Sequence, residues 1–251
     1  DVESGNITIK KTSDNSTIET IDVTSNQVSG SGGTQITVNP SSNLAGSTEF
    51  YVLIDATAFD DSSSNSYAGI SSTTALSFTT VDTTAPTLSS SSPADNATNV
   101  AVDANIVLTF SETVDTESGN ITIKKTSDDS TVETIDVTSN KVTGNGFVPL
   151  GGGANGTIIT INPASNFDGS TEYYVLIDST AFDDSSSNSY AGISSTTALS
   201  FTTVDTANPT LSTSTPADNA ANVAVSSNII LNFDENVDVE SGNLIIKRSF
   251  D

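Results

Sequence analysis

Residues 170–206 read STEYYVLIDSTAFDDSSSNSYAGISSTTALSFTTVDT, and residues 47–83 repeat this text almost without change. The two copies differ at two positions only, Phe50/Tyr173 and Ala56/Ser179. Repetition of this kind indicates the architecture before any other feature does. Its period exceeds about 100 residues, which is the size of one independently folding domain and too long for a solenoid turn. The sequence therefore predicts a tandem array of similar domains.

The limits of the repeat follow from the positions at which the same sequence begins again. Residues 1–26 return as residues 115–140 with few changes, and Asp238 opens a third copy. The predicted units are a partial repeat without its front strands at 1–81, a complete repeat at 82–204, and the front of a third repeat at 205–251. We expect this window to belong to a much longer chain. The alternative is that the front of one molecule completes the back of the next.

The composition excludes several classes of function. Seven basic residues stand against 31 acidic ones, for a net charge of −24, which argues against binding to nucleic acid or to an anionic membrane. The chain has no Cys, so it holds no disulfide framework and no thiol chemistry. No apolar run is long enough for membrane insertion within this window. We expect a folded, extracellular or cell-surface protein.

Apolar residues alternate with polar ones throughout residues 82–204. Ile106, Leu108 and Phe110 share one face of a predicted strand, and residues 173–177 are apolar on both faces, as expected of a central strand. Turn-forming residues separate such segments roughly every ten positions, which is typical of a β-sandwich. About seven short strands in one unit predict an all-β chain of immunoglobulin-like sandwiches laid end to end.

Two motifs resemble a known family. Residues 92–102 read SPADNATNVAV and residues 106–114 read IVLTFSETV; the pattern continues in Tyr173-x-Val175-x-Ile177 and closes with Phe201-Thr-Thr and Asp205-Thr206. It resembles the bacterial immunoglobulin-like domains of very large surface proteins. That resemblance spans the chain and implies a tandem module of adhesins, biofilm proteins or surface layers, often dependent on calcium at the domain junctions.

The chain offers few side chains that could act in catalysis. Without His or Cys, neither a Ser-His-Asp nor a Cys-His arrangement is possible, and the abundant Ser residues lack an activating base. Paired carboxylates cleave glycosides in other proteins, but near-identical copies of the same carboxylates do not resemble one shaped active site. We therefore expect that the chain is not an enzyme.

Hard oxygen ligands, which suit Ca²⁺, are the one chemistry present in quantity. Three clusters are candidates. The junction cluster holds Asp82 and Asp205, where one domain passes to the next. The strand-end cluster holds Glu112, Asp115 and Glu117, with counterparts Glu235, Asp238 and Glu240. The loop cluster holds Asp178, Asp183, Asp184 and Asn188, with counterparts Asp55, Asp60, Asp61 and Asn65.

Each cluster has a second interpretation as a solvated acidic turn, because Asp, Asn and Ser also cap and turn the backbone. The loop cluster places oxygens at Asp184, Ser186 and Asn188, faintly like an EF-hand loop, but no Glu follows at the far end. Both interpretations stay open for the sequence alone.

Three functions compete. The first is a structural stalk, fibre or surface-layer lattice. Its repeats act as a rigid spacer that calcium stiffens at the domain junctions, and they pack against neighbouring copies of the same repeat. The second is an adhesin module that binds a surface glycan or protein. Exposed aromatic side chains would favour it, and Tyr67 and Tyr190 are the aromatic residues in the loops. The third is an accessory module of a secreted hydrolase. Near-identity of the copies favours the first, since a stalk needs only the same module many times.

Overall fold

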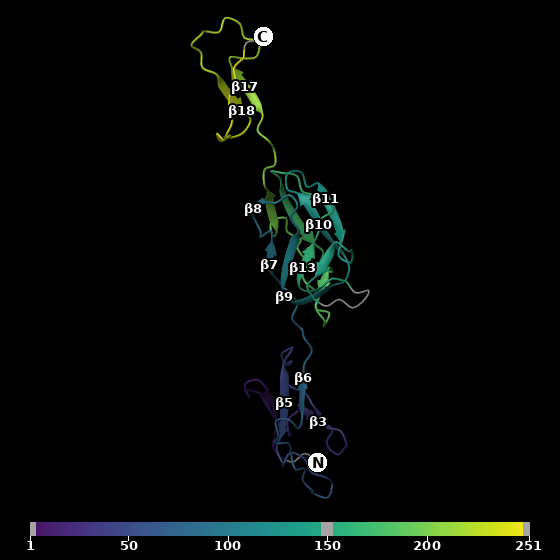
Figure 1. Ribbon diagram of the computed structural model, residues 1–251. Helices are drawn as coiled ribbons and strands as arrows, with labels where there is room; N and C mark the ends of the chain where they lie inside the picture. Colours follow the sequence, from purple (N-terminus) through teal and green to yellow (C-terminus); the bar gives the residue numbers. More distant parts are fainter. Residues whose placement is uncertain (1–3, 147–152, 248–251) are drawn as a thin grey trace.

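The computed structural model describes residues 4–146 and 153–247 and folds them into strands and turns, with no helix among them. The strands form three groups that follow one another along the chain and lie in a row, joined by single extended segments (Figure 1). We call these the first unit (β1–β6), the middle unit (β7–β16) and the last unit (β17 and β18). The prediction of an all-β chain of repeated sandwich units is confirmed.

The middle unit is a sandwich of two sheets whose inner faces share one core. One sheet runs in the order β11 (Thr131–Asp136), β10 (Asn120–Lys125), β14 (Glu172–Ile177), β16 (Ser200–Thr203) and β8 (Ala97–Val100). The other runs in the order β12 (Val142–Gly144), β13 (Asn155–Ile161), β9 (Ile106–Thr116) and β15 (Phe182–Asp183), and β7 (Leu88–Ser92) also pairs with β9. All of these pairs are antiparallel except the parallel pair β16–β8, and one buried face per sheet explains why the sequence alternates with period two.

Strand β9 supplies the centre of this core. Its residues Ile106, Leu108 and Phe110 alternate with partly exposed neighbours, and none of the three is more than 3% exposed. The ring of Phe110 lies 5.3 Å from that of Phe182 and 5.2 Å from that of Tyr190, measured between centroids. Because burial of one such side chain contributes about 1.5–3 kcal/mol, β9 accounts for a large share of the stability of the middle unit.

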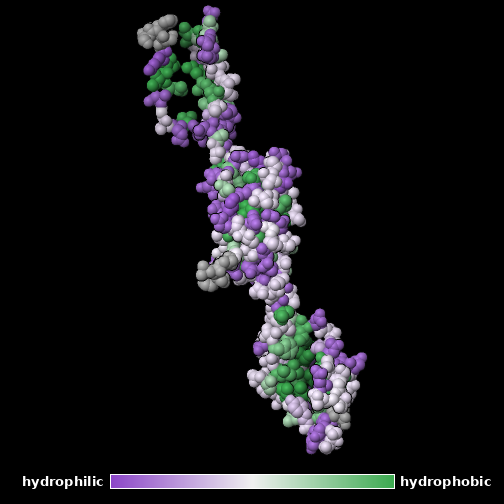
Figure 2. Space-filling model, turned by 90° about the vertical axis from the view of Figure 1, so that its right-hand side faces the viewer, coloured by the Kyte–Doolittle hydropathy of each residue, from purple (hydrophilic) through white to green (hydrophobic). Residues whose placement is uncertain are grey.

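The first unit repeats the back part of the middle unit. Its sheet has the order β2 (Thr17–Asp22), β1 (Asn6–Lys11), β5 (Glu49–Ile54) and β6 (Ser77–Thr79), and β3 (Val28–Ser29) pairs with β4 (Thr37–Val38). Its register is the same, since Ile7 faces Ile54 as Ile121 faces Ile177. Within the part of this unit that the structure describes, no strand corresponds to β7, β8 or β9. Part of its core therefore faces solvent, and Figure 2 shows hydrophobic side chains gathered on this unit.

The last unit holds a two-stranded sheet, β17 (Leu211–Thr215) and β18 (Ile230–Phe233). This sheet corresponds to the β7–β9 pair and has the same register, because Leu211 faces Phe233 as Leu88 faces Phe110. No second sheet covers it among residues 205–247, and every residue of β18 is exposed. The last unit thus presents the front strands that the first unit lacks.

Strand β9 is longer than the sequence indicates. It runs to Thr116, so Glu112 lies well within it, while Asp115 and Glu117 of the predicted strand-end cluster flank its last residue. The ladder continues because Asp115 has partners on both sides: Asn155 of β13 and Asp183 of β15. The expected total of about seven strands also missed β8, β12 and β15, since elements of two to four residues are too short to show alternation.

Candidate functional site

The acidic side chains of the middle unit assemble into two groups that cut across the three clusters expected from the sequence. The junction group consists of Asp82, Glu112 and Asp184. The cross-strand group consists of Asp115, Glu117 and Asp183. In each group, one carboxylate oxygen per residue lies within 4.8 Å of the other two. Each group therefore draws on segments that are distant in the sequence.

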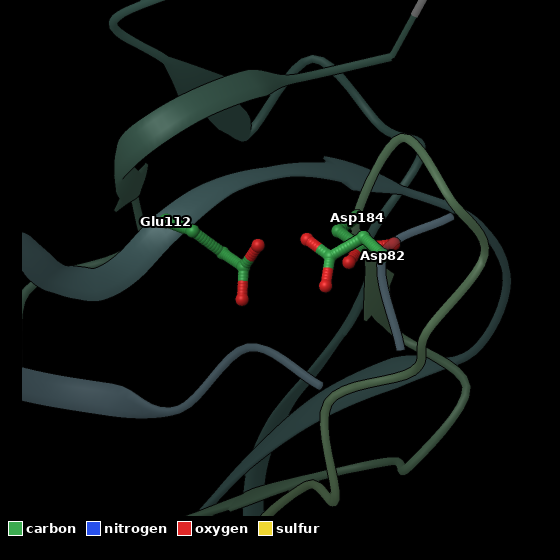
Figure 3. A group of neighbouring side chains, drawn as sticks. All are labelled: Asp82, Glu112 and Asp184. Atoms are coloured by element: carbon green, nitrogen blue, oxygen red, sulfur yellow. The ribbon is translucent and has the colours of Figure 1, made fainter. Parts of the chain in front are cut away.

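The junction group is built from a linker, a strand and a loop. Asp82 belongs to the segment that enters the middle unit, Glu112 projects from β9, and Asp184 follows β15 directly. Figure 3 shows the carboxyl group of Glu112 facing those of Asp82 and Asp184 across an open space. Asp184 is only 5% exposed, whereas the other two are half-buried. The folded chain thus holds three carboxyl groups together at the joint between two units.

Electrostatics of the junction group favour a positive ion. Burial raises the pKa of Glu112, and the charges of Asp82 and Asp184 raise it further. The pKa of Asp184 is instead lowered, because the side chain and backbone of Asn188 and the backbone of Ser186 donate hydrogen bonds to its carboxylate. The group therefore contains one carboxylate held in its charged form beside another whose charge is disfavoured, and a cation between them would relieve the conflict.

Asn188 ties the loop to the linker. Its side-chain Nδ2 donates to Oδ2 of Asp184 at 2.9 Å and to the backbone carbonyl of Asp82 at 3.2 Å. The corresponding Asn65 donates to Asp61 in the same way, at 2.8 Å. Asp184 and Asn188 therefore form a hydrogen-bonded turn, as the second interpretation of the loop cluster predicts. Asn188 in addition holds the entering linker through the carbonyl of Asp82.

The cross-strand group places two carboxyl groups directly opposite each other. Asp183 of β15 faces Asp115 of β9 in the ladder, and Glu117 lies just beyond the end of β9. Oδ1 of Asp115 and Oδ1 of Asp183 are both buried and have no hydrogen-bond donor. Like charges in this position repel each other. Burial and the neighbouring Asp115 raise the pKa of Asp183 to about 7.

Both groups fit a calcium ion by the same distance argument. Calcium binds carboxylate oxygens at about 2.3–2.6 Å, so two of its ligands are at most about 5 Å apart. The 4.8 Å limit found in both groups meets this condition. In the cross-strand group the two buried oxygens without donors are the ones that a cation would satisfy. Such an ion would neutralise the carboxylates and cross-link the elements that hold them.

Several expected residues lie elsewhere. Asp178 accepts a hydrogen bond from the backbone amide of Asn120 at 2.8 Å and belongs to neither group. Asp55 accepts the equivalent bond from Asn6 at 2.9 Å. In the last unit, Asp238 is exposed and lies in neither of the two groups.

At the second joint, the pair Asp82 and Glu112 recurs as Asp205 and Glu235. Burial raises the pKa of Glu235, and the charge of Asp205 raises it further. The joint between the middle and last units therefore repeats two of the three carboxylates of the junction group.

In the sequence alone, Asp183 and Asp184 belong to one cluster. Asp183 ends β15 and Asp184 follows it directly; consecutive residues of an extended chain point to opposite sides, so the two neighbours belong to different groups. The two neighbouring Asp residues are evident in the sequence, but the short β15 that turns them to opposite sides is not. The pairing of Asp183 with Asp115 depends on the full length of β9, which the alternation of residues 106–110 does not indicate.

These features define a tandem array of immunoglobulin-like β-sandwich modules whose joints gather carboxylates. The model of the bacterial Ig-like domain family matches residues 4–80, 82–203 and 205–249, and the chain belongs to this family. Comparison with curated protein sequences gave no match, and neither did comparison with solved structures. Domains of this family are generally non-catalytic and are typical of extracellular and surface proteins of bacteria. No helix able to cross a membrane occurs among the residues that the structure describes.

Proposed function

We propose that this chain is a structural repeat region of a large extracellular bacterial surface protein, such as an adhesin stalk, a fibre or a surface-layer lattice. It acts as a rigid spacer, and calcium at the domain joints stiffens it. The observation that carries the proposal is the junction group, in which the linker residue Asp82 meets Glu112 and Asp184 of the following unit.

Repetition supports the spacer role. The second joint presents Asp205 beside Glu235, so the same joint chemistry recurs one unit later. The linker is also short, and Pro86 within it is buried and fixes its own φ angle. A short restrained linker, with the Asp and Glu pair recurring at each joint, favours a rod over a flexible string.

Calcium would act by cross-linking the linker to the following unit. In the junction group, Asp82 belongs to the linker while Glu112 and Asp184 belong to the sandwich, so one ion bound to all three holds the joint in one orientation. In the cross-strand group, Asp115, Glu117 and Asp183 lie within one unit, so an ion there stabilises the fold. An ion that binds only the folded state raises its stability by mass action.

The rigidity of the first joint tests this proposal directly. The chain has no Cys, so Cys introduced at the exposed and equivalent positions Ser13 and Ser127 carries one spin label on each unit. We expect the distance distribution between the labels to be narrow in Ca²⁺ and broader in a chelator. Mg²⁺ at equal ionic strength should not reproduce the narrowing, because it demands a tighter octahedral shell.

Two outcomes would count against separate parts of the proposal. A distribution that is broad with and without Ca²⁺ would refute the rigid spacer. A distribution that is equally narrow in both, and unchanged by Asp82→Asn combined with Glu112→Gln, would refute the calcium joint and leave the spacer standing. The matched control is Asp103→Asn, which removes a charge from an exposed position outside both groups.

A further inference from the structure

A front strand and the last strand of the middle unit lie side by side and run in the same direction. Strand β16 pairs with β8 in parallel, with Phe201 opposite Ala97 and Thr203 opposite Val100. The other strand pairs described in this unit are antiparallel. This single parallel contact joins the segment where the chain enters the unit to the segment where it leaves.

Tension along the row of units pulls these two strands in opposite directions. The first and last units lie at opposite ends of the middle unit, β7 and β8 are its first two strands, and β16 is its last (Figure 1). Tension therefore draws β8 by its first residue and β16 by its last residue. In a parallel pair these residues lie at opposite ends of the ladder, so all the bonds between the strands are loaded together, in shear. An antiparallel pair loaded in the same way would open one bond at a time.

Hydrogen bonds close the β8–β16 contact at both ends. At one end the carbonyl of Ser200 accepts from the backbone amide of Asn96 at 2.8 Å, and at the other the carbonyl of Val100 accepts from the amide of Val204 at 2.8 Å. Oδ1 of Asp95 also accepts from the backbone amide of Ser200 at 2.9 Å and from its Oγ at 3.2 Å. Ser200 is only 6% exposed, so water has little access to these bonds and they are stronger than on an open surface.

The residues that make these bonds recur along the chain. Residues 92–100 read SPADNATNV and residues 215–223 read TPADNAANV, so both contain the Asp-Asn step. In the later copy Nδ2 of Asn219 donates to Oδ2 of Asp218 at 2.9 Å, as the equivalent Asn does in the middle unit at 2.7 Å. Ser77 stands at the position of Ser200 in the earlier copy. The parts of the contact are therefore a property of the repeat and not of one module.

We propose that the β8–β16 pair is a force-bearing clamp, which keeps each module folded when the array is pulled along its length. Asp95 acts in it by holding the first residue of β16 through two hydrogen bonds. The inference rests on the proposed spacer function, because a spacer carries the tension between the two bodies that it separates. It lies within one complete module, so it holds whether or not calcium binds at the joints.

Pulling the full chain by its two ends in an optical trap, in a chelator, tests the clamp. Unfolding of the middle unit from β7 to β16 is recognised by the release of about 350–400 Å of chain. We expect Asp95→Ala to raise the rate of unfolding at constant force by about tenfold or more, because it removes the acceptor of both bonds from Ser200. Asp95→Asn keeps an Oδ1 acceptor and should stay within about threefold of the original chain.

Asp178→Ala is the matched control. Oδ2 of Asp178 accepts a hydrogen bond from the backbone amide of Asn120 at 2.8 Å, and this bond joins β10 to the end of β14, away from β8 and β16. We expect the two Ala variants to lose similar stability in urea, while Asp178→Ala unfolds under load within about threefold of the original rate. The difference between force and urea separates a clamp from a merely stabilising contact.

An unchanged rate of unfolding under load for Asp95→Ala, or an equal rise for the two Ala variants, would overturn the clamp. If Asp95→Ala does not fold, Ser200→Ala takes its place: it removes only the bond from Oγ and should give a smaller rise, and no rise would equally overturn the proposal. The spin-label distances across the first joint do not depend on β8 or β16. The clamp and the rigid spacer therefore fail in separate experiments.

Discussion

Replacing Asp183 by Asn should stabilise the middle unit in the absence of calcium. In the original chain, Asp183 faces Asp115 across the β9–β15 ladder, and its pKa is raised from 3.8 to about 7 by burial and by that neighbour. Asn removes the repelling charge, and its amide supplies a donor to the buried Oδ1 of Asp115, which has none. The substitution therefore improves a contact that the charged pair leaves unfavourable.

The magnitude follows from the size of the pKa change. One pKa unit corresponds to about 1.4 kcal/mol, so the full change corresponds to about 4 kcal/mol. Solvent reaches part of the group and screens it, and we expect about 1–2 kcal/mol to be realised. For a unit of this size, that is a rise in Tm of about 3–10 °C, measured by calorimetry of the full chain in a chelator at pH 8.

The sign of the pH dependence provides a second check. Because the folded-state pKa of Asp183 is raised, the folded state binds this proton more strongly than the unfolded state does. The stability that this group contributes is present below pH 3.8 and is lost as the pH rises to about 7. The advantage of Asp183→Asn should therefore be largest and constant above about pH 7, and it should vanish as the pH falls toward 3.8.

Calcium should reverse the order of the two proteins. We expect the original chain to gain stability from an ion held by the cross-strand group, whereas Asp183→Asn offers one neutral oxygen in place of a carboxylate and should lose most of that gain. Asp103→Asn, at an exposed position outside both groups, should change neither the Tm in chelator nor the response to calcium. A lower Tm of Asp183→Asn in chelator at pH 8 would refute the reasoning, because it would mean that the two carboxyl groups do not repel each other.

Three further changes test other parts of the structure. Phe110→Ala should destabilise the middle unit by about 3–5 kcal/mol, seen in urea unfolding, because it empties a fully buried aromatic site. Gly119→Ala should cost about 1–3 kcal/mol in the same assay, since Gly119 has a φ of +119° and an added Cβ would lie 3.0 Å from Oδ2 of Asp178. Asn188→Ala should broaden the distance distribution between spin labels on the first and middle units, because it removes the hydrogen bond to the carbonyl of Asp82; an unchanged distribution would show that this bond does not restrain the linker.

The fold was predictable from the sequence because its signal is repeated and local. Alternation places Ile106, Leu108 and Phe110 on one face, and the structure buries all three. The turn residues between strands recur in each copy, so one unit supports the interpretation of the next. The short strands were not predicted because an element such as β15, with two residues, is too short to show a period.

The candidate site was predictable in its residue types but not in its grouping. The sequence marks Asp82, Glu112 and Asp184 as candidate ligands, yet it assigns them to three separate clusters. Which carboxylates meet depends on how far β9 extends and on which loop packs beside it, and both are set by pairing between distant segments. Composition and spacing along the chain contain no information of that kind.

The loop aromatic Tyr67 and its copy Tyr190 show the same limit within one molecule. Their sequence surroundings are identical, yet Tyr67 is 43% exposed and Tyr190 only 7%. Tyr190 is buried because its ring packs edge-on against Phe110 of β9, and the first unit has no such strand among its described residues. A binding role for these aromatics therefore has no support in a complete unit, where the ring belongs to the core. Whether such a residue is surface or core is decided by a strand that is remote in sequence, and completing the first unit should bury Tyr67 as well.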